Sequence, residues 1–368
     1  MTRSARGLFA VAAMVAAGWV AGCAKHEEEV TLPSSRTRYD CLIVRNGGEE
    51  VKSKEFPAFH RADAAPEDGP CEPSAERAAP LLGTEVRIAV YGVTRPKGED
   101  AIAEAMGRIA ELSRKLNIFD PKSDASLINR DAATRPVPLD ADLERIIDRS
   151  REIAELSGGA FDATVGPLTA LWRENRVAKK LPADDEIARA RALVGFDKVQ
   201  FSGAPGRRTV KFAREGMSFD FGGIAKGYAA EEAMKTLYRQ GIRAAVVACA
   251  GSIKLMGLRG DGRPFRVGIS DPRPPHVNRY VVPLTDASID TSGNYIQFTM
   301  IDGKRYSHII DPRTGQAIEA LPSVTVVGPD GTMCDALSTT IGILGVDEGL
   351  KLIDRLNGDD RPPVERVK

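Results

Sequence analysis

The spacing of apolar positions predicts helices along much of this 368-residue chain. Apolar residues recur at every third or fourth position, as one buried helix face requires, in six stretches: 99–116, 140–158, 183–194, 226–241, 336–344 and 347–356. The second stretch begins at Asp140, a residue type that caps helices, and is closed by Gly158. These six stretches are therefore interpreted as amphipathic helices.

Between the fourth and fifth helices, short apolar runs separated by turn residues predict strands. With an earlier alternating run, the expected strands are 86–91, 244–248, 252–258, 265–269, 280–284, 287–290, 295–300 and 323–327. Asp302-Gly303 is a strong hairpin signal. Residues 36–80 are rich in loop-forming residues and are interpreted as an amino-terminal extension. The order of elements predicts a mixed α/β chain of the α+β class.

The amino terminus has the pattern of an export signal. Two arginines precede an uncharged run at 7–20, which is too short to span a bilayer comfortably and is typical of a signal-peptide core. The run leads to Val-Ala-Gly-Cys at 20–23, the pattern of a bacterial lipoprotein cleavage site. We expect residues 1–22 to be removed, Cys23 to carry the lipid and residues 23–35 to form a tether. An ordinary signal peptide with a chance cysteine is the alternative.

This prediction places the protein in the bacterial cell envelope, anchored to a membrane through its lipid and facing the periplasm. Of the five cysteines, Cys41 and Cys71 flank a polar segment, and the sequence leaves open whether they form a disulfide. Cys249 and Cys334 lie in apolar contexts and are expected to be buried thiols. The formal net charge is zero and no basic run is interleaved with aromatics, so we expect no nucleic-acid partner.

The first chemical signal lies in residues 217–228. An apolar run ends at Asp220, a glycine pair turns the backbone, and a helix-like stretch containing Lys226 follows. Small residues let main-chain N–H groups approach an anion closely, and a helix N-terminus favours negative charge. The segment therefore predicts a phosphate site within reach of Lys226. A strand–glycine–helix corner used only for packing would have the same pattern.

A second signal comes from Asp335, Ser338 and Thr339, which share one face if a helix contains them. One carboxylate and two hydroxyls are hard oxygen ligands of the kind that Mg²⁺ binds together with a phosphate. The alternative is an ordinary helix cap, with Asp335 capping and the hydroxyls bonded to local backbone.

Three further segments are ambiguous in the same way. His308 ends a predicted strand before the turn at 311–315, where it could be a general base or only a hydrogen-bonding turn residue. Phe119 leaves a helix and could pack inward or stack on a planar ligand. Ala160, Phe161 and Asp162 follow a glycine pair that could end a helix or form a backbone-rich ligand wall.

Taken together, these segments resemble the ApbE family, the FAD:protein FMN transferases long labelled thiamine-biosynthesis lipoproteins. Seven segments carry the resemblance in the family's order: 82–84, 119–129, 161–168, 220–228, 291–293, 308–315 and 335–339. The resemblance covers roughly residues 80–356, and a flavin transferase domain is expected over 81–360. It implies central, mostly antiparallel sheets flanked by helices.

The resemblance also implies the chemistry. Family members bind FAD and Mg²⁺, transfer the FMN half to a Thr or Ser hydroxyl of a target protein, and release AMP. The targets would be exported flavoprotein subunits of membrane electron-transfer complexes. His308 would be the base for the acceptor hydroxyl, with Asp311 as a candidate to orient it. The implied metal ligands are Gly223 through its carbonyl, Asp335, Ser338 and Thr339. The implied FAD contacts are Leu82, Phe119, Ala160, Phe161, Asp162, Asp220, Lys226 and Ile310.

Of the positions that depart from the family pattern, two bear most directly on the site. Ser338 stands where some members have an acidic residue, which would loosen the hold on the metal. Phe119 replaces a tyrosine but keeps a stacking face. Two other functions stay open: a metal-dependent FAD pyrophosphatase that yields FMN and AMP, and a non-catalytic flavin-binding lipoprotein.

Overall fold

The computed structural model describes residues 38–44, 50–53, 56–58, 60–62, 71–273, 277–293, 298–318, 323–358 and 365–367. The expected signal peptide, Cys23 and the expected tether lie outside these residues. Within them, no helix combines the length and the apolar character needed to cross a membrane.

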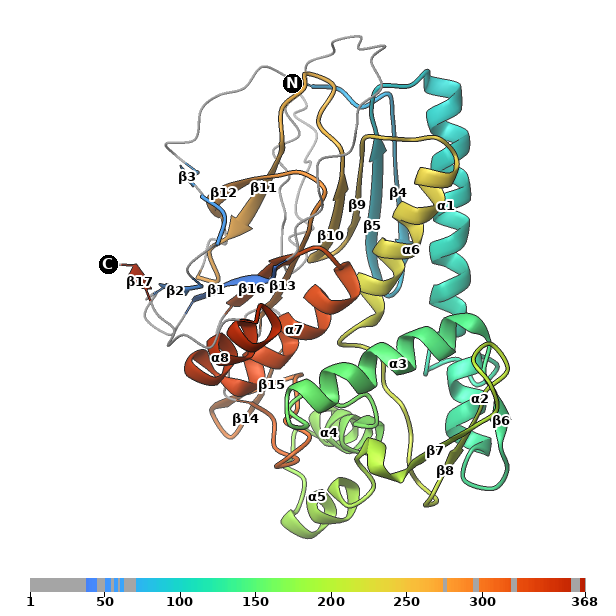
Figure 1. The fold of residues 1–368 in the computed structure, drawn as a ribbon. Helices are drawn as coiled ribbons and strands as arrows, with labels where there is room; N and C mark the ends of the chain where they lie inside the picture. The colour runs from blue at the N-terminus through green and yellow to red at the C-terminus, as the bar shows by residue number, and fades with distance from the viewer. Residues whose placement is uncertain are drawn as a thin grey trace, which may run out of the picture.

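A twisted antiparallel sheet forms the centre of the molecule (Figure 1). In the described part of the chain it has nine strands, in the order β17 (Glu365–Val367), β2 (Glu50–Lys52), β1 (Asp40–Val44), β16 (Ser323–Gly328), β13 (Ser288–Gly293), β10 (Ser252–Met256), β9 (Ala245–Cys249), β5 (Thr84–Val90) and β4 (Ala75–Leu81). Every neighbouring pair is antiparallel. The prediction of an α+β fold with mostly antiparallel sheets is confirmed.

Helices cover one face of this sheet (Figure 1). They are α1 (Arg95–Lys115), α6 (Ala225–Arg239), α7 (Gly331–Leu344) and α8 (Val346–Leu356). Alternate strand residues such as Ile88, Val247 and Val326 pack with these helices in one apolar core. The residues between them, such as Ala89 and Val327, point to the other face, as the two-residue period of a strand requires.

A small sheet covers that other face. It consists of β11 (Phe265–Ser270), β12 (Asn278–Leu284) and β3 (His60–Arg61). A helical layer lies at one end of the large sheet, at the bottom of Figure 1. Its elements are α2 (Asp124–Asp131), β6 (Val137–Pro138), α3 (Ala141–Leu156), α4 (Gly166–Ala178), α5 (Asp184–Arg191), η1 (Phe196–Lys198), β7 (Val199–Ser202) and β8 (Thr209–Phe212). The hairpin predicted at Asp302-Gly303 is present as β14 (Phe298–Ile301) and β15 (Lys304–Ser307).

The structure corrects two sequence interpretations. The segment 36–80 is not purely loop-rich, because β1 and β2 belong to the large sheet and β4 pairs along its length with β5. The helix expected from residue 336 begins earlier, at Gly331, because Asp330 caps it by accepting hydrogen bonds from the N–H groups of Thr332 (2.9 Å) and Met333 (3.2 Å). Asp335 is therefore not a cap but lies inside the helix.

Cys41 and Cys71 do not form a disulfide, since both are buried free thiols. Cys41 lies on the helix-covered face of the large sheet, whereas Cys71 packs in the core between the two sheets. The expectation for Cys249 and Cys334 is confirmed, since both are buried thiols. Burial raises the pKa of Cys249 to about 12.

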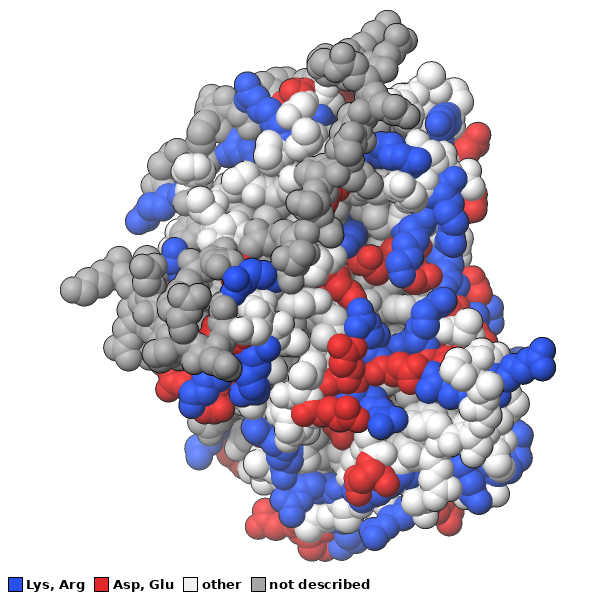
Figure 2. Space-filling view, viewed as in Figure 1, with Lys and Arg blue, Asp and Glu red and all other residues white. Residues whose placement is uncertain are grey.

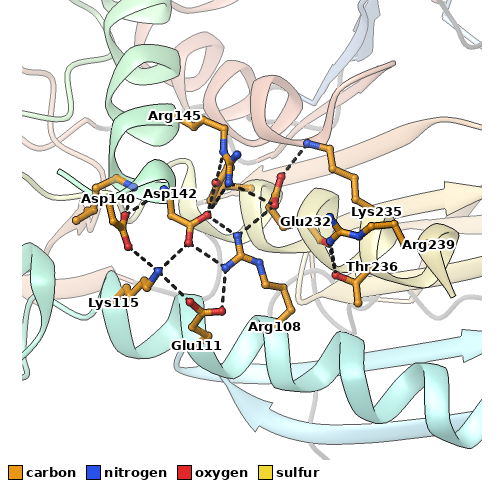
Figure 3. Close-up of polar contacts among 12 residues, drawn as sticks. Arg108, Glu111, Lys115, Asp140, Asp142, Arg145, Glu232, Lys235, Thr236 and Arg239 are labelled. Carbon is orange, nitrogen blue, oxygen red and sulfur yellow. Dashed lines mark hydrogen bonds and ion pairs between the residues drawn. The ribbon is translucent and has the colours of Figure 1, made fainter. Parts of the chain in front are cut away.

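An ion-pair network joins three helices (Figure 3). Arg108 on α1 donates to Asp142 on α3 (Nη1–Oδ2 2.9 Å) and to Glu232 on α6 (Nη2–Oε2 3.2 Å). Lys115 also donates to Asp142 (3.0 Å). Burial raises the pKa of Asp142, but Arg108 and Lys115 outweigh it and hold that pKa well below its usual range. On this face of the molecule, charges of both signs are interleaved (Figure 2).

Candidate functional site

The glycine-rich segment before α6 is shaped by Asp220. Its Oδ1 accepts a hydrogen bond from the N–H of Gly222 (2.9 Å), and its Oδ2 accepts one from the Thr169 hydroxyl (2.8 Å). A Cβ at Gly223 would lie 3.2 Å from the Phe161 ring and 3.5 Å from the Thr339 methyl group. Three predicted site residues, far apart in the sequence, therefore meet at Gly223.

Asp335 lies on α7 against the first turn of α6. It is fully buried, and its Oδ2 accepts a hydrogen bond from the N–H of Gly227 (2.9 Å). The ammonium group of Lys226 lies 3.2 Å from Asp335 Oδ1 and 3.5 Å from the carbonyl oxygen of Gly222. The helices can approach so closely only because position 227 has no side chain. The buried carboxylate is thus held by a cation and a backbone donor from one helix N-terminus.

Hydroxyl groups from β13 and α7 form a connected set next to Asp335. The Ser338 hydroxyl lies 2.7 Å from the Ser292 hydroxyl, which in turn is 3.3 Å from Thr339 Oγ1. Ser338 Oγ is also 2.9 Å from the carbonyl oxygen of Asp335. The face predicted for Asp335, Ser338 and Thr339 therefore exists, and it points toward β13 and the start of α6.

Sequence reasoning missed Asp290, a second buried carboxylate in this cluster. It is 2 % exposed, lies opposite Ser252 in the β10–β13 pair, and its Oδ1 accepts a hydrogen bond from Ser338 (2.8 Å). Burial and then the charge of Asp335 raise the pKa of Asp290 to about 7, although Lys226 acts in the opposite direction. An aspartate inside a short apolar run was the available signal.

The cluster combines carboxylates with hydroxyls. Among the described residues, no group of three or more His, Cys, Asp or Glu side chains is placed to hold a metal ion. Two carboxylates lie within a set of hydroxyl oxygens, and oxygen ligands of this kind are those that Mg²⁺ prefers. Asp335 and then Asp290 raise the pKa of Lys226 above its ordinary value, against the opposing effect of burial, so the ammonium stays charged.

His308 lies where the sequence predicted, directly after β15, and is half-buried. Hydrogen bonds hold the turn that follows: Asp311 accepts from Arg313 through both carboxylate oxygens (3.0 and 2.8 Å), and Trp172 on α4 donates to the carbonyl of Gly315 (2.8 Å). A Cβ at Gly159 would lie 3.9 Å from the side chain of Arg313. The loop that carries Phe161 thus lies between the turn after His308 and Gly223.

Known proteins share this arrangement of segments. The sequence model of the ApbE family matches residues 82–360. The chain belongs to the ApbE family. Its relatives include proteins named FAD:protein FMN transferase. The protein from Treponema pallidum is 33% identical over a match of 301 positions that covers 77% of this chain and 82% of the relative. The one from Klebsiella pneumoniae is 31% identical over 276 residues, 74% of this chain and 79% of the relative.

Solved ApbE structures have the same fold. The ApbE protein from Thermotoga maritima has a TM-score of 0.68 at 31% identity, over 77% of this chain and 91% of that one. The flavin transferase ApbE from Vibrio cholerae has a TM-score of 0.66 at 27% identity, over 76% of this chain and 90% of that one. The resemblance stated from the sequence segments is therefore confirmed.

The remaining positions expected from the ApbE family lie on loops and turns. Phe119 is 70% exposed, with the Arg173 guanidinium 4.8 Å from its ring centre, so it does not pack inward. Leu82 occupies the β4–β5 turn with a positive φ of 54° and donates its N–H to the Ser113 hydroxyl (3.1 Å). Ala160, Phe161 and Ile310 are buried.

Asp162 has a structural role in its loop. Its Oδ1 accepts hydrogen bonds from the N–H (2.8 Å) and the hydroxyl (2.7 Å) of Thr164, and burial raises its pKa. The Thr164 hydroxyl accepts a hydrogen bond from the N–H of Gly195 (2.7 Å). These bonds fix the backbone of the loop, which is the part expected to contact the nucleotide.

Proposed function

We propose that this chain is an FAD:protein FMN transferase that moves FMN from FAD to a Thr or Ser hydroxyl of a target protein and releases AMP. The observation that carries the proposal is the cluster of the buried Asp335 and Ser338 with the half-buried Thr339, beside Lys226, in a chain of the ApbE family. Two relatives named FAD:protein FMN transferase, 31% and 33% identical, support it.

The cluster fits Mg²⁺. Asp335 offers a carboxylate, Ser338 and Thr339 offer hydroxyls, and Gly223, which lies beside Thr339, would add its backbone carbonyl. The buried, unpartnered Oδ2 of Asp290 adds negative charge to the same place. When bound there, Mg²⁺ would supply positive charge against the pyrophosphate of FAD.

The protein's own groups position and polarise the reactants. Lys226 lies in the first turn of α6 beside Asp335, and both a lysine ammonium and a helix N-terminus favour the negative charge of a pyrophosphate. His308 takes the proton of the acceptor hydroxyl as its oxygen attacks the FMN-side phosphorus. The bond from that phosphorus to the bridging oxygen breaks, and AMP leaves. The exposed ring of Phe119 offers a stacking face for a planar part of FAD.

The site of action follows from the amino terminus. Residues 1–22 would direct export, and a lipid on Cys23 would hold the protein on a bacterial membrane, facing the periplasm. The acceptors would then be exported flavoprotein subunits of membrane electron-transfer complexes.

The test incubates the purified chain with FAD, Mg²⁺ and a candidate acceptor domain, and reads acceptor mass and AMP release together. A mass gain equal to FMN that disappears when the acceptor threonine is replaced would establish the transferase. FMN and AMP without a mass gain would indicate the pyrophosphatase. Bound FAD without either product, across several acceptors, would leave a flavin-binding lipoprotein.

A further inference from the structure

Asp290 carries a buried carboxylate oxygen with nothing bonded to it. The residue is 2 % exposed, and among the residues that the structure describes its Oδ2 has no hydrogen-bond partner. Its other oxygen accepts the Ser338 hydroxyl, at 2.8 Å, and the Ser252 hydroxyl, opposite on β10, also interacts with this carboxylate. Buried carboxylates are normally paired, fully hydrogen-bonded or bound to a metal, so this half-bonded group needs an explanation.

The position of Asp290 on its strand links it to the predicted metal ligands. Asp290 and Ser292 are two residues apart on β13, so their side chains share the face covered by α7. Asp290 bonds to Ser338, while Ser292 bonds to Ser338 (2.7 Å) and lies 3.3 Å from Thr339 Oγ1. The strand therefore presents a carboxylate and a hydroxyl to the same helical turn that carries the expected ligands.

Among the described residues, this cluster places one lysine beside two carboxylates. Lys226 forms an ion pair with Asp335 at 3.2 Å, and the Gly227 N–H gives Asp335 a further hydrogen bond. Asp290 interacts with both of these charged residues electrostatically, but it has no ion pair of its own among the described contacts. When Asp290 is ionised, the three groups together carry one excess negative charge in a buried place, which a divalent cation would neutralise.

We infer that Asp290 on β13 is part of the cation-binding cluster. It supplies the second carboxylate of the cluster, because position 338 on α7 carries a serine hydroxyl and not an acidic side chain. The ligand is a divalent cation that prefers oxygen ligands. The inference rests on the proposed function for the use of that cation, but cation binding is measurable without any transfer reaction. Some members of the ApbE family have an acidic residue at the position of Ser338. In this chain the acidic residue is Asp290 instead, and its carboxylate bonds to the Ser338 hydroxyl.

The experiment measures Mn²⁺ binding to the purified, metal-free full chain by electron paramagnetic resonance, and the Mg²⁺-induced rise in melting temperature. Asp290→Asn should weaken Mn²⁺ binding by about tenfold or more. It should shrink the Mg²⁺-induced rise accordingly. The matched control is Asp286→Asn, four residues earlier, whose carboxylate also has an unpartnered Oδ2 but whose Oδ1 bonds to the Gly257 N–H (2.7 Å). Its cation affinity should equal that of the unmodified chain.

A double variant that moves the carboxylate to another position distinguishes the effect of its charge from the effect of packing. Asp290→Ala combined with Ser338→Asp moves the carboxylate to α7 and should recover Mn²⁺ affinity relative to Asp290→Ala alone. If Asp290→Asn fails to fold, the comparison of Asp290→Ala with the double variant tests the inference in its place. Unchanged affinity in a folded Asp290→Asn, no recovery in the double variant, or no cation binding by the unmodified chain would each overturn the inference. FMN transfer to an acceptor is assayed separately, so the proposed function stands or fails on different data.

Discussion

The contact between α6 and α7 at Gly227 can be tested with one methyl group. A Cβ at position 227 would lie 2.1 Å from the carbonyl oxygen of Gly331 and 2.7 Å from Cβ of Asp335, where side-chain carbons essentially never come closer than 3.0 Å. The first of these neighbours is backbone, so it cannot rotate away as the end of a flexible side chain can. In Gly227→Ala, the two helices must therefore move apart.

The magnitude follows from two opposing effects. Alanine is better than glycine inside a helix by about 1 kcal/mol. Overpacking a tight site costs about 1–3 kcal/mol. Separating the helices also weakens the hydrogen bond from the Gly227 N–H to Asp335, and bonds to charged groups contribute about 1.5–3 kcal/mol. We expect Gly227→Ala to lower the free energy of unfolding by about 2 kcal/mol, from the sum of these effects.

Gly107→Ala is the matched control. Gly107 is exposed on α1, and a Cβ there would have no heavy atom within 4 Å, so only the helix preference remains. This variant should raise the free energy of unfolding by up to about 1 kcal/mol. Urea denaturation followed by circular dichroism measures both, and Mn²⁺ binding should weaken only in Gly227→Ala. If the two variants were equally stable, α6 and α7 would not be held in the close contact that positions Asp335.

Three further predictions address the chemistry and the stability of the fold. Asp335→Ala should abolish Mg²⁺-dependent turnover while leaving a folded protein; full activity would remove Asp335 from the cation site. His308→Ala should keep the Kd for FAD but lose transfer, whereas weaker binding with normal turnover would make His308 a binding residue. Asp142→Asn should destabilise the protein by about 3 kcal/mol at pH 7, because Arg108 and Lys115 lose a buried partner. Since the folded-state pKa of Asp142 lies below its ordinary value of 3.8, this stability is present above pH 4 and is lost as the pH falls, so the two proteins should converge in acid.

Elements with a broad apolar face were predictable, and elements without one were not. The helix expected at 140–158 is present as α3, with Asp140 accepting hydrogen bonds as its cap, because eight of its residues are buried in a regular pattern. In α4 only Gly166, Leu168 and Trp172 are buried, so its sequence shows little periodicity. The short strand β1 is a different case, because its residues 41–44 are apolar but the segment around it is rich in loop-forming residues. It is stabilised by pairing with the fully buried strand β16, far along the chain.

The site also has a part that the sequence predicts and a part that it does not. The face formed by Asp335, Ser338 and Thr339 follows from helical spacing alone, and His308 follows from the turn after it. The contribution of Asp290 does not follow from local spacing, because Asp290 bonds to Ser338 across a separation of 48 residues. Only the pairing of β10, β13 and β16 determines that this strand residue faces α7. Local spacing therefore predicts the part of the site on one element, and strand register determines what the other elements add.

The buried carboxylates also connect stability with function. Ser338 gives Asp290 one hydrogen bond and Lys226 gives Asp335 one ion pair, which leaves the cluster short of positive charge in the metal-free protein. Such a cluster destabilises the fold until a cation enters, and the binding free energy then adds to the free energy of unfolding. Neutralising Asp290 should therefore leave the metal-free protein as stable as before or more stable, while it lowers the melting temperature at saturating Mg²⁺ relative to the unmodified chain. A residue that served only packing would change both states in the same direction, so the opposite signs distinguish a cation ligand from a core residue.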